Sequence, residues 1–154
     1  MIFRLIPVLS LFLLIGNSIA MPLVRTDGEF VINIRGAREK QMVISDVRLQ
    51  RRAMQGFTRF VLKGISQDGD FYIKIAFDDM ALIKRKFTIP GEARCKIFLI
   101  NEQKEKQTTK VTSGYVQITH LDADSLSGTL KYTGRLNNRP IKIKGHFQVR
   151  DGLS

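Results

Sequence analysis

Residues 126–135, LSGTLKYTGR, and residues 139–150, RPIKIKGHFQVR, flank the pair Asn137-Asn138 near the end of the chain. Each flanking segment alternates apolar and polar residues, which is the pattern of a half-buried β-strand. Asparagine tolerates positive φ, so the pair predicts a two-residue type I′ turn and therefore a hairpin. In this hairpin, residues that face each other have numbers that add to 275.

This register predicts how the hairpin packs. Leu130 faces Gly145 and Gly128 faces Phe147, so a bulky side chain fills the space that each glycine leaves open. Pro140 has no N–H to donate, and the missing donor points away from the hairpin partner. The last strand is therefore expected to lie at a sheet edge at Pro140.

The other face of the hairpin is basic. Lys142, Lys144, His146 and Arg150 alternate with the apolar residues of the last segment, and Lys131 is expected across from Lys144. Directly opposed like charges destabilise a sheet by roughly a few tenths of a kcal/mol. Two interpretations stay open. The face is either solvated, with lysines that discourage edge pairing, or a docking face for an acidic protein, a polyanion or an anionic membrane surface.

The chain upstream of the hairpin also consists of short segments with strand character. The expected strands carry Phe30, Ile32 and Ile34; Val43, Val47 and Leu49; and residues 57–65, 71–77, 86–89, 95–100 and 115–119. Residues 79–84 are expected to form one helical turn, and residues 101–110 a solvated hairpin tip. The prediction is an all-β domain, an antiparallel sandwich or small barrel of about 8–9 strands.

The first twenty residues have the pattern of a secretory signal peptide. Arg4 precedes the apolar run from Leu5 to Ile15, and small residues stand at Ser18 and Ala20. The run is too short for a comfortable transmembrane helix, which needs about 20 residues. We therefore expect a signal peptide at 1–20, a single domain at 21–154 without a transmembrane span, and a secreted or periplasmic location. The alternatives are an uncleaved anchor and translation from Met21, which would give a cytosolic protein.

The composition is that of a basic globular domain. The 154 residues include 25 Lys plus Arg and 14 Asp plus Glu, a formal charge of +11. The single cysteine excludes an intramolecular disulfide framework and leaves too few thiolates for a structural zinc site. Such a charge is common in nucleic-acid-binding proteins, but tryptophan is absent and no exposed aromatic interrupts the basic strand. No specific nucleic-acid binding is expected.

Motifs for catalysis, metals or cofactors are weak. Residues 122–125 begin like a calcium loop, but Leu126 replaces the expected oxygen ligand. His120 and His146 are too isolated for a metal site, and no nucleophile-elbow glycine pattern surrounds Ser125. Cys95 alternates with apolar neighbours, which favours a buried and inert thiol. We expect no enzyme activity, cofactor or metal.

The segment from Gly114 to Thr119, the run Ser127-Gly128-Thr129-Leu130 and the closing segment 141–149 carry a family resemblance. Over its last 40 or so residues the chain resembles small, uncharacterised secreted or lipid-anchored bacterial β-domains. The resemblance implies an envelope or secreted location and a sandwich or barrel-like fold, and it carries over no catalytic residues. Position 21 is Met, whereas lipid-anchored members have cysteine at the cleavage site.

The sequence thus predicts an exported, non-enzymatic binding or interaction module of the bacterial envelope. Its candidate partner-binding residues are Lys131, Lys142, Lys144, His146 and Arg150. The alternative is a lipocalin-like carrier that holds a small apolar ligand inside a barrel. An interior cavity of ligand size would distinguish the two.

Overall fold

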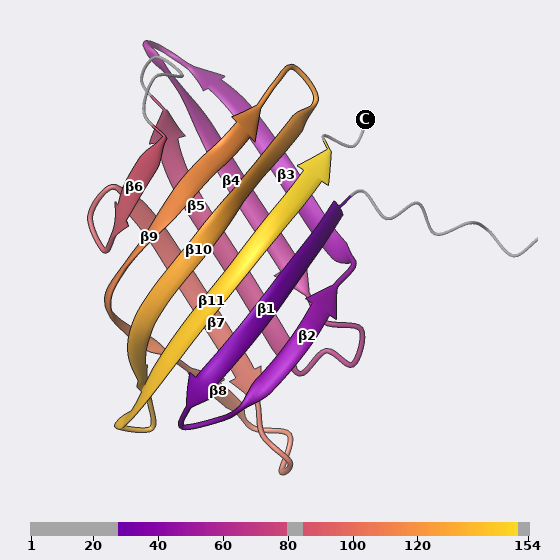
Figure 1. Ribbon diagram of the computed structural model, residues 1–154, viewed down its shortest axis with the longest axis vertical. Coiled ribbons are helices and arrows are strands. Elements are labelled where there is room, and N and C mark those ends of the chain that lie inside the picture. Colours follow the sequence, from indigo (N-terminus) through magenta and orange to yellow (C-terminus); the bar gives the residue numbers. More distant parts are fainter. Residues whose placement is uncertain (1–27, 80–84, 151–154) are drawn as a thin grey trace, which may run out of the picture.

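The computed structural model describes residues 28–79 and 85–150, most of which lie in β-strands (Figure 1). The strands of these ranges are β1 Gly28–Gly36, β2 Lys40–Ile44, β3 Asp46–Met54, β4 Phe57–Ile65, β5 Phe71–Asp79, β6 Lys86–Ile89, β7 Ala93–Ile100, β8 Lys106–Thr108, β9 Lys110–Leu121, β10 Ser125–Leu136 and β11 Arg139–Arg150. They form a six-stranded sheet, β2-β1-β11-β10-β9-β6, and a five-stranded sheet, β3-β4-β5-β7-β8, with antiparallel neighbours throughout.

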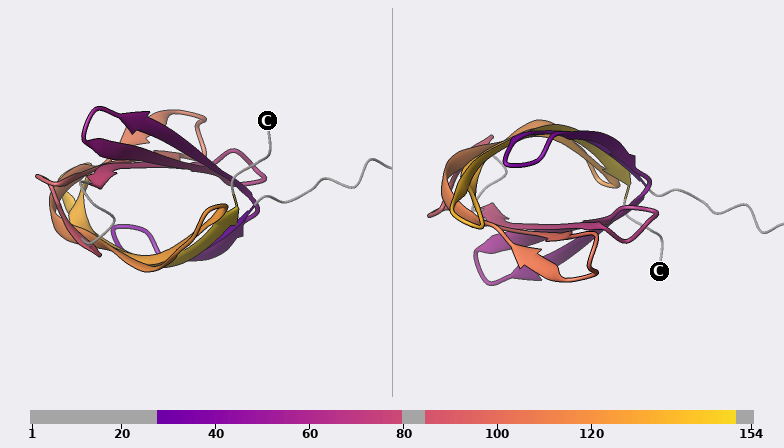
Figure 2. Two further views of the ribbon diagram at one scale, coloured as in Figure 1. Left: turned by 90° about the horizontal axis from the view of Figure 1, so that it is seen from above. Right: turned by 90° about the horizontal axis from the view of Figure 1, so that it is seen from below.

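The two sheets lie face to face as two layers (Figure 2). They stay separate sheets and do not close into one barrel, so the all-β prediction is confirmed and the sandwich is the form that fits. In the described ranges no helix is present that has the length and apolar character to cross a bilayer.

The space between the layers is filled by aliphatic and aromatic side chains from both sheets. Phe77 of β5 and Phe87 of β6 join the layers, with ring centroids 4.5 Å apart. Phe60 of β4 stacks on Phe77, with ring centroids 5.2 Å apart. All three rings are almost fully buried. Burial of such rings is the main term that holds two sheets together.

The closing hairpin has the predicted register. Tyr132 faces Ile143 and Gly128 faces Phe147, and both asparagines of the turn have positive φ, 49° and 64°. A Cβ on Gly128 would lie 2.7 Å from the ring of Phe147, and one on Gly145 would lie 2.6 Å from the ring of Phe30. The glycines therefore let two aromatic rings lie directly against the backbone of the sheet.

The prediction of a sheet edge at Pro140 is wrong. Strand β11 is interior, between β1 and β10. Strand β1 ends at Gly36, opposite Ile141, so its ladder stops one residue before the proline. Pro140 only accepts there, from the N–H of Ala37 at 2.9 Å. The missing N–H thus lies at the end of a ladder and not along an edge.

The single strand expected from Val43, Val47 and Leu49 is also wrong, because the chain passes between the sheets at Ser45. Strand β2 belongs to the six-stranded sheet and β3 to the five-stranded sheet. Because of this crossing, the buried side chains change from even-numbered positions in β2 to odd-numbered positions in β3. Ile44 and Val47 are buried, whereas Val43 is 59% exposed.

Other expected segments have different outcomes. Part of the hairpin tip expected at 101–110 is strand β8, so the described residues hold eleven strands and not 8–9. The strand expected at 95–100 corresponds to β7, which lies between β5 and β8 in its sheet. Strand β8, at the edge of this sheet, is only three residues long. Asp79 ends β5, and the rest of the helical turn expected at 79–84 lies outside the described residues, as does the signal peptide at 1–20.

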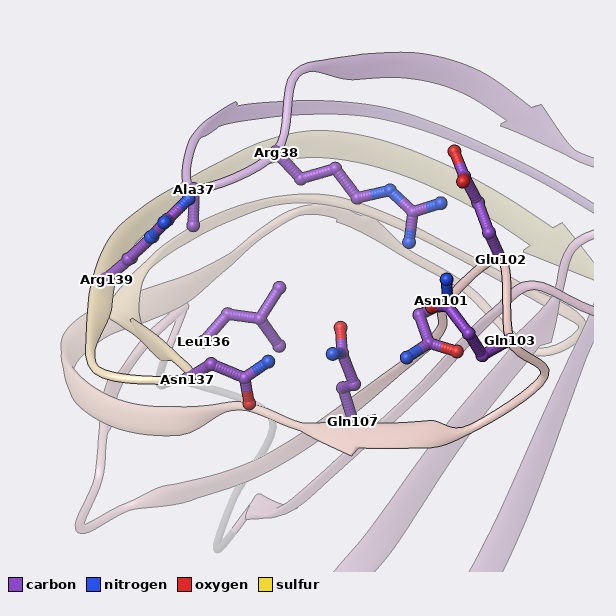
Figure 3. A pocket seen from close by; sticks show the side chains of 9 residues that line it. All are labelled: Ala37, Arg38, Asn101, Glu102, Gln103, Gln107, Leu136, Asn137 and Arg139. Carbon is purple, nitrogen blue, oxygen red and sulfur yellow. The ribbon is translucent and has the colours of Figure 1, made fainter.

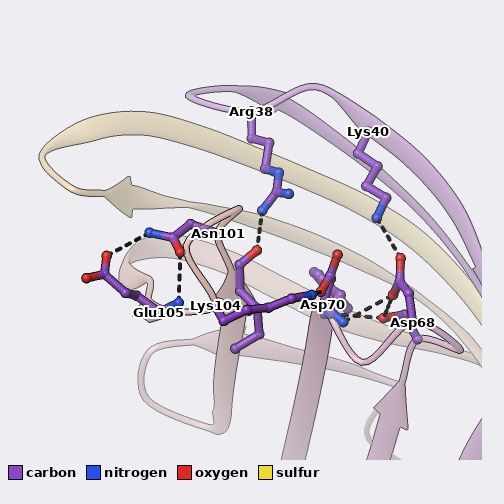
Figure 4. Close-up of polar contacts among 10 residues, drawn as sticks. Arg38, Lys40, Asp68, Asp70, Asn101, Lys104 and Glu105 are labelled. Atoms are coloured by element: carbon purple, nitrogen blue, oxygen red, sulfur yellow. Dashed lines mark hydrogen bonds and ion pairs between the residues drawn. The ribbon is translucent and has the colours of Figure 1, made fainter.

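Polar contacts join the layers at their margins. Near one end, the Arg38 guanidinium donates to the carbonyl of Ile100 at 3.0 Å, and Lys40 pairs with Asp68 at 3.2 Å (Figure 4). Elsewhere, Arg51 of β3 donates to three carbonyls of the β9–β10 turn at 2.7–3.1 Å. These contacts fix how the two sheets sit relative to each other.

The Asp68 contact predicts a pH dependence of stability. Hydrogen bonds from the Ser66 hydroxyl, the Asp70 amide and Lys40 lower the pKa of Asp68 from 3.8 to about 2. A lowered pKa contributes stability that is present above the unfolded value and is lost as pH falls through the folded value. Asp68→Asn should therefore be less stable than the wild type above about pH 4, and the gap should close towards pH 2. Urea unfolding across this range checks it, and a gap that does not change with pH would contradict it.

Candidate functional site

The outer face of the six-stranded sheet carries the residues that the sequence singled out. Lys131, Lys142, Lys144, His146 and Arg150 are all exposed, and each alternates with buried neighbours. Lys131 lies directly opposite Lys144, as predicted. The burial of the intervening residues dictates this outward orientation, since a strand sends successive side chains to opposite faces.

A groove of about 530 Å³ crosses this face. Its basic residues are Lys131, Lys144 and His146, which come from β10 and β11. The side chains of Asn33 and Gln41 extend it across β1 and β2. The groove therefore runs across the strands and not along them, and cations lie among side chains that donate and accept hydrogen bonds.

Tyr115 lines the groove on its β9 side, and Lys86 of β6 contacts the tyrosine ring. Tyr115 is directly opposite Lys131, and the Lys86 ammonium lies 4.3 Å from the centre of the tyrosine ring. Tyr115 belongs to the strand expected at 115–119 and is not among the residues predicted to bind a partner. The pairing of β9 with β10 brings it into the groove, and that pairing was not readable from the hairpin alone.

The remaining predicted residues lie outside the groove. Lys142 is one row away and faces Arg35 of β1. Arg150 ends β11 opposite Ser125, four residues beyond His146. The structure thus brings together three of the five predicted residues, and the outward alternation that predicted them does not by itself define a site.

These cations are not neutralised by neighbours. Among the described residues, no acidic group lies within ion-pair distance of Lys131, Lys142 or Lys144. Opposition of Lys131 with Lys144 costs stability without an internal partner to offset it. A face built in this way attracts anions over a distance of several ångströms in water.

A second basic surface on the five-stranded sheet was missed in the sequence. Register places Lys63, Lys74 and Lys96 side by side on β4, β5 and β7, and Arg48 of β3 continues the row. Neighbouring strands are about 4.8 Å apart, so four cations follow one another across the sheet. The row depends on two strand pairings, β4 with β5 and β5 with β7, and neither register was predicted from the sequence.

The residues that suggested chemistry form a capped turn. His120 Nε2 lies 2.8 Å from Asp122 Oδ2, and the amide of Ser125 donates to Asp122 Oδ1 at 2.6 Å. The His120 contact, with the hydrogen bonds from Ser125 and Asp124, holds the pKa of Asp122 well below its usual range. The carboxylate closes the β9–β10 turn, and in the described ranges no cluster of three His, Cys, Asp or Glu residues has metal-binding geometry.

Cys95 lies on β7 beside the core cluster. Burial raises the pKa of its thiol to about 12. Burial thus favours the protonated thiol, which is less nucleophilic than the thiolate.

A further hollow, of about 500 Å³, lies at one end of the sandwich (Figure 3). Arg38, Asn101, Gln107 and Asn137 line it from different turns and strands, and Leu136 lies among them. Its lining is mainly polar, which does not match the apolar cavity of a carrier for a small apolar ligand.

The lysine row yields a stability prediction. Lys74→Glu turns two like-charge oppositions, with Lys63 and Lys96, into opposite-charge pairs. At low salt the Glu variant should be about 0.5–1 kcal/mol more stable than the matched Lys74→Gln variant. The difference should shrink at high salt because these groups are partly exposed. Urea unfolding at two salt concentrations measures it, and a Glu variant less stable than the Gln variant at low salt would refute it.

Comparison with known proteins finds no matching family model, no similar curated protein and no similar solved structure.

Proposed function

We propose that this protein is an exported, non-enzymatic binding module that holds a linear polyanion in the groove across its six-stranded sheet. The observation that carries the proposal is the opposed pair Lys131 and Lys144 in that groove, without an acidic neighbour among the described residues. A bound anionic chain would offset the repulsion between the two lysines. The repulsion that destabilises the free fold therefore contributes to the free energy of binding.

The groove lining favours a hydrophilic partner. Asn33, Gln41 and Thr129 supply amide and hydroxyl groups beside the lysines. Val31 adds an aliphatic side chain, whereas the side chain of Leu130 is buried in the core. Charged groups joined by a polar backbone, as in an acidic polysaccharide, match both features. The direction of the groove across the strands suits an extended chain.

Export is the second part of the proposal. It rests on the signal-peptide pattern of residues 1–20, which predicts a secreted or periplasmic location. The carrier alternative receives no support from the filled core, where Phe30, Tyr132 and Ile143 are almost fully buried.

A matched pair of triple variants tests the proposal with heparin, a sulfated polysaccharide, as the probe. Replacing the groove residues Lys131 and Lys144, together with Lys142 in the neighbouring row, by Gln should weaken binding by about 1.4–2.8 kcal/mol, which is roughly tenfold to a hundredfold. It should also flatten the salt dependence of the affinity, because fewer counterions are released. Isothermal titration calorimetry at several salt concentrations measures both quantities.

The control removes the same charge from elsewhere. Arg52, Arg94 and Lys104 are exposed and lie outside the groove, so replacing all three by Gln should change the heparin affinity much less. Equal weakening by both variants would mean that net charge alone attracts heparin, and the groove proposal would then fail.

A further inference from the structure

The outer face of the five-stranded sheet carries an apolar row beside its lysine row. Ile65, Tyr72 and Phe98 are directly paired across β4, β5 and β7. Ile65 is 42% exposed, and the two rings are partly exposed. Ile100 extends the strip, which borders a hollow of about 440 Å³ lined mainly by apolar groups. We call these four residues the apolar strip.

The rings of the strip are not free stacking platforms. Tyr72 stacks against Phe98 with centroids 5.4 Å apart, and the Lys106 ammonium lies 3.7 Å from the centre of the Phe98 ring. Strand β7 lies between β5 and β8, so these contacts reach Phe98 from opposite sides. With both flanks of the ring covered, a nucleic-acid base has no open face to stack on.

Cations border the strip at short range. Lys63, Lys74 and Lys96 stand two residues further along their strands, a separation of about 7 Å. In the described part of the chain, no acidic group lies within ion-pair distance of these three lysines. The acids of this face are already engaged, since Asp46 pairs with Arg48 and Asp78 with Arg59.

We propose that this face docks on a lipid bilayer surface that contains anionic lipids. The apolar strip enters the interfacial region, and the lysine row meets the headgroup phosphates. Aromatic and basic side chains together are typical of the membrane interface. A hydrophilic polyanion would satisfy the lysines but would leave the strip in water, so the combination favours a bilayer.

The two layers of the sandwich point in opposite directions, so a molecule docked through this face presents the six-stranded sheet away from the membrane (Figure 2). This inference uses a different surface from the polyanion groove and stands independently of it.

Vesicle co-sedimentation tests the docking face. The full chain should bind vesicles of phosphatidylglycerol and phosphatidylcholine in equal parts, and bind pure phosphatidylcholine much more weakly. Replacing Lys63, Lys74 and Lys96 by Gln should lower partitioning on the order of 100-fold, since each lysine near an anionic surface contributes about fivefold. In the matched control, Gln replaces Lys110, Arg135 and Arg139, which are exposed cations of the other sheet. This variant should bind the vesicles like the wild type.

The strip is tested by an inserted fluorophore, because the chain contains no tryptophan. Phe98→Trp should shift its emission to the blue on anionic vesicles and be quenched by brominated phosphatidylcholine. Tyr115→Trp, on the opposite sheet, should show neither effect.

Three outcomes would overturn the proposal. One is absence of binding to the anionic vesicles. Another is equal quenching of both tryptophan reporters. The third is binding of heparin or a single-stranded oligonucleotide that the triple replacement of Lys63, Lys74 and Lys96 abolishes, while vesicle binding does not occur.

Discussion

Strand pairing between β10 and β11 is the constraint on which the rest of the molecule depends. Twelve consecutive pairs fix the register from Ser125 with Arg150 to Leu136 with Arg139. If one strand slipped by one residue, its buried side chains would all face the solvent. It would also place a side chain where Gly128 now allows the ring of Phe147 to touch the backbone. The register that buries the apolar set therefore also fixes which side chains face outward.

The outer surfaces follow from the same rule but differ in chemistry. On the six-stranded sheet, lysines stand among amides and hydroxyls in a groove. On the five-stranded sheet, lysines stand beside an apolar strip. Charge alone would predict that both surfaces bind any polyanion. What lies next to the charge distinguishes a hydrophilic chain from a bilayer as the partner, and this contrast underlies the two proposals.

Local signals predicted the fold well where strands are joined by short turns. The asparagine pair predicts the register of the closing hairpin, and the structure has this register. Sequence reasoning failed where the chain changes sheets. At Ser45 the buried positions change from even to odd numbers between Ile44 and Val47. Apolar residues lie on both sides of Ser45, so the sequence pattern looks like that of a single strand. Proline at 140 was misread for a related reason, since where β1 ends depends on a contact more than 100 residues away in sequence.

Local patterns also predicted part of the candidate surface. Alternation marked Lys131 and Lys144 as outward and opposed. It gave no indication that Tyr115 and Asn33 border them, because those neighbours come from pairings with β9 and β1. The row of Lys63, Lys74 and Lys96 needs three strands in register, and neither of its two pairings was predicted from the sequence.

Mapping the bound surface by amide chemical shifts tests the central claim, a polyanion site on the hairpin face, most directly. During titration with heparin, the account predicts shifts concentrated at residues that line the groove, including Lys131, Lys144, His146, Tyr115 and Asn33. Amides of the five-stranded sheet should change little. Shifts centred on Lys63, Lys74 and Lys96, or spread evenly over both sheets, would contradict the account.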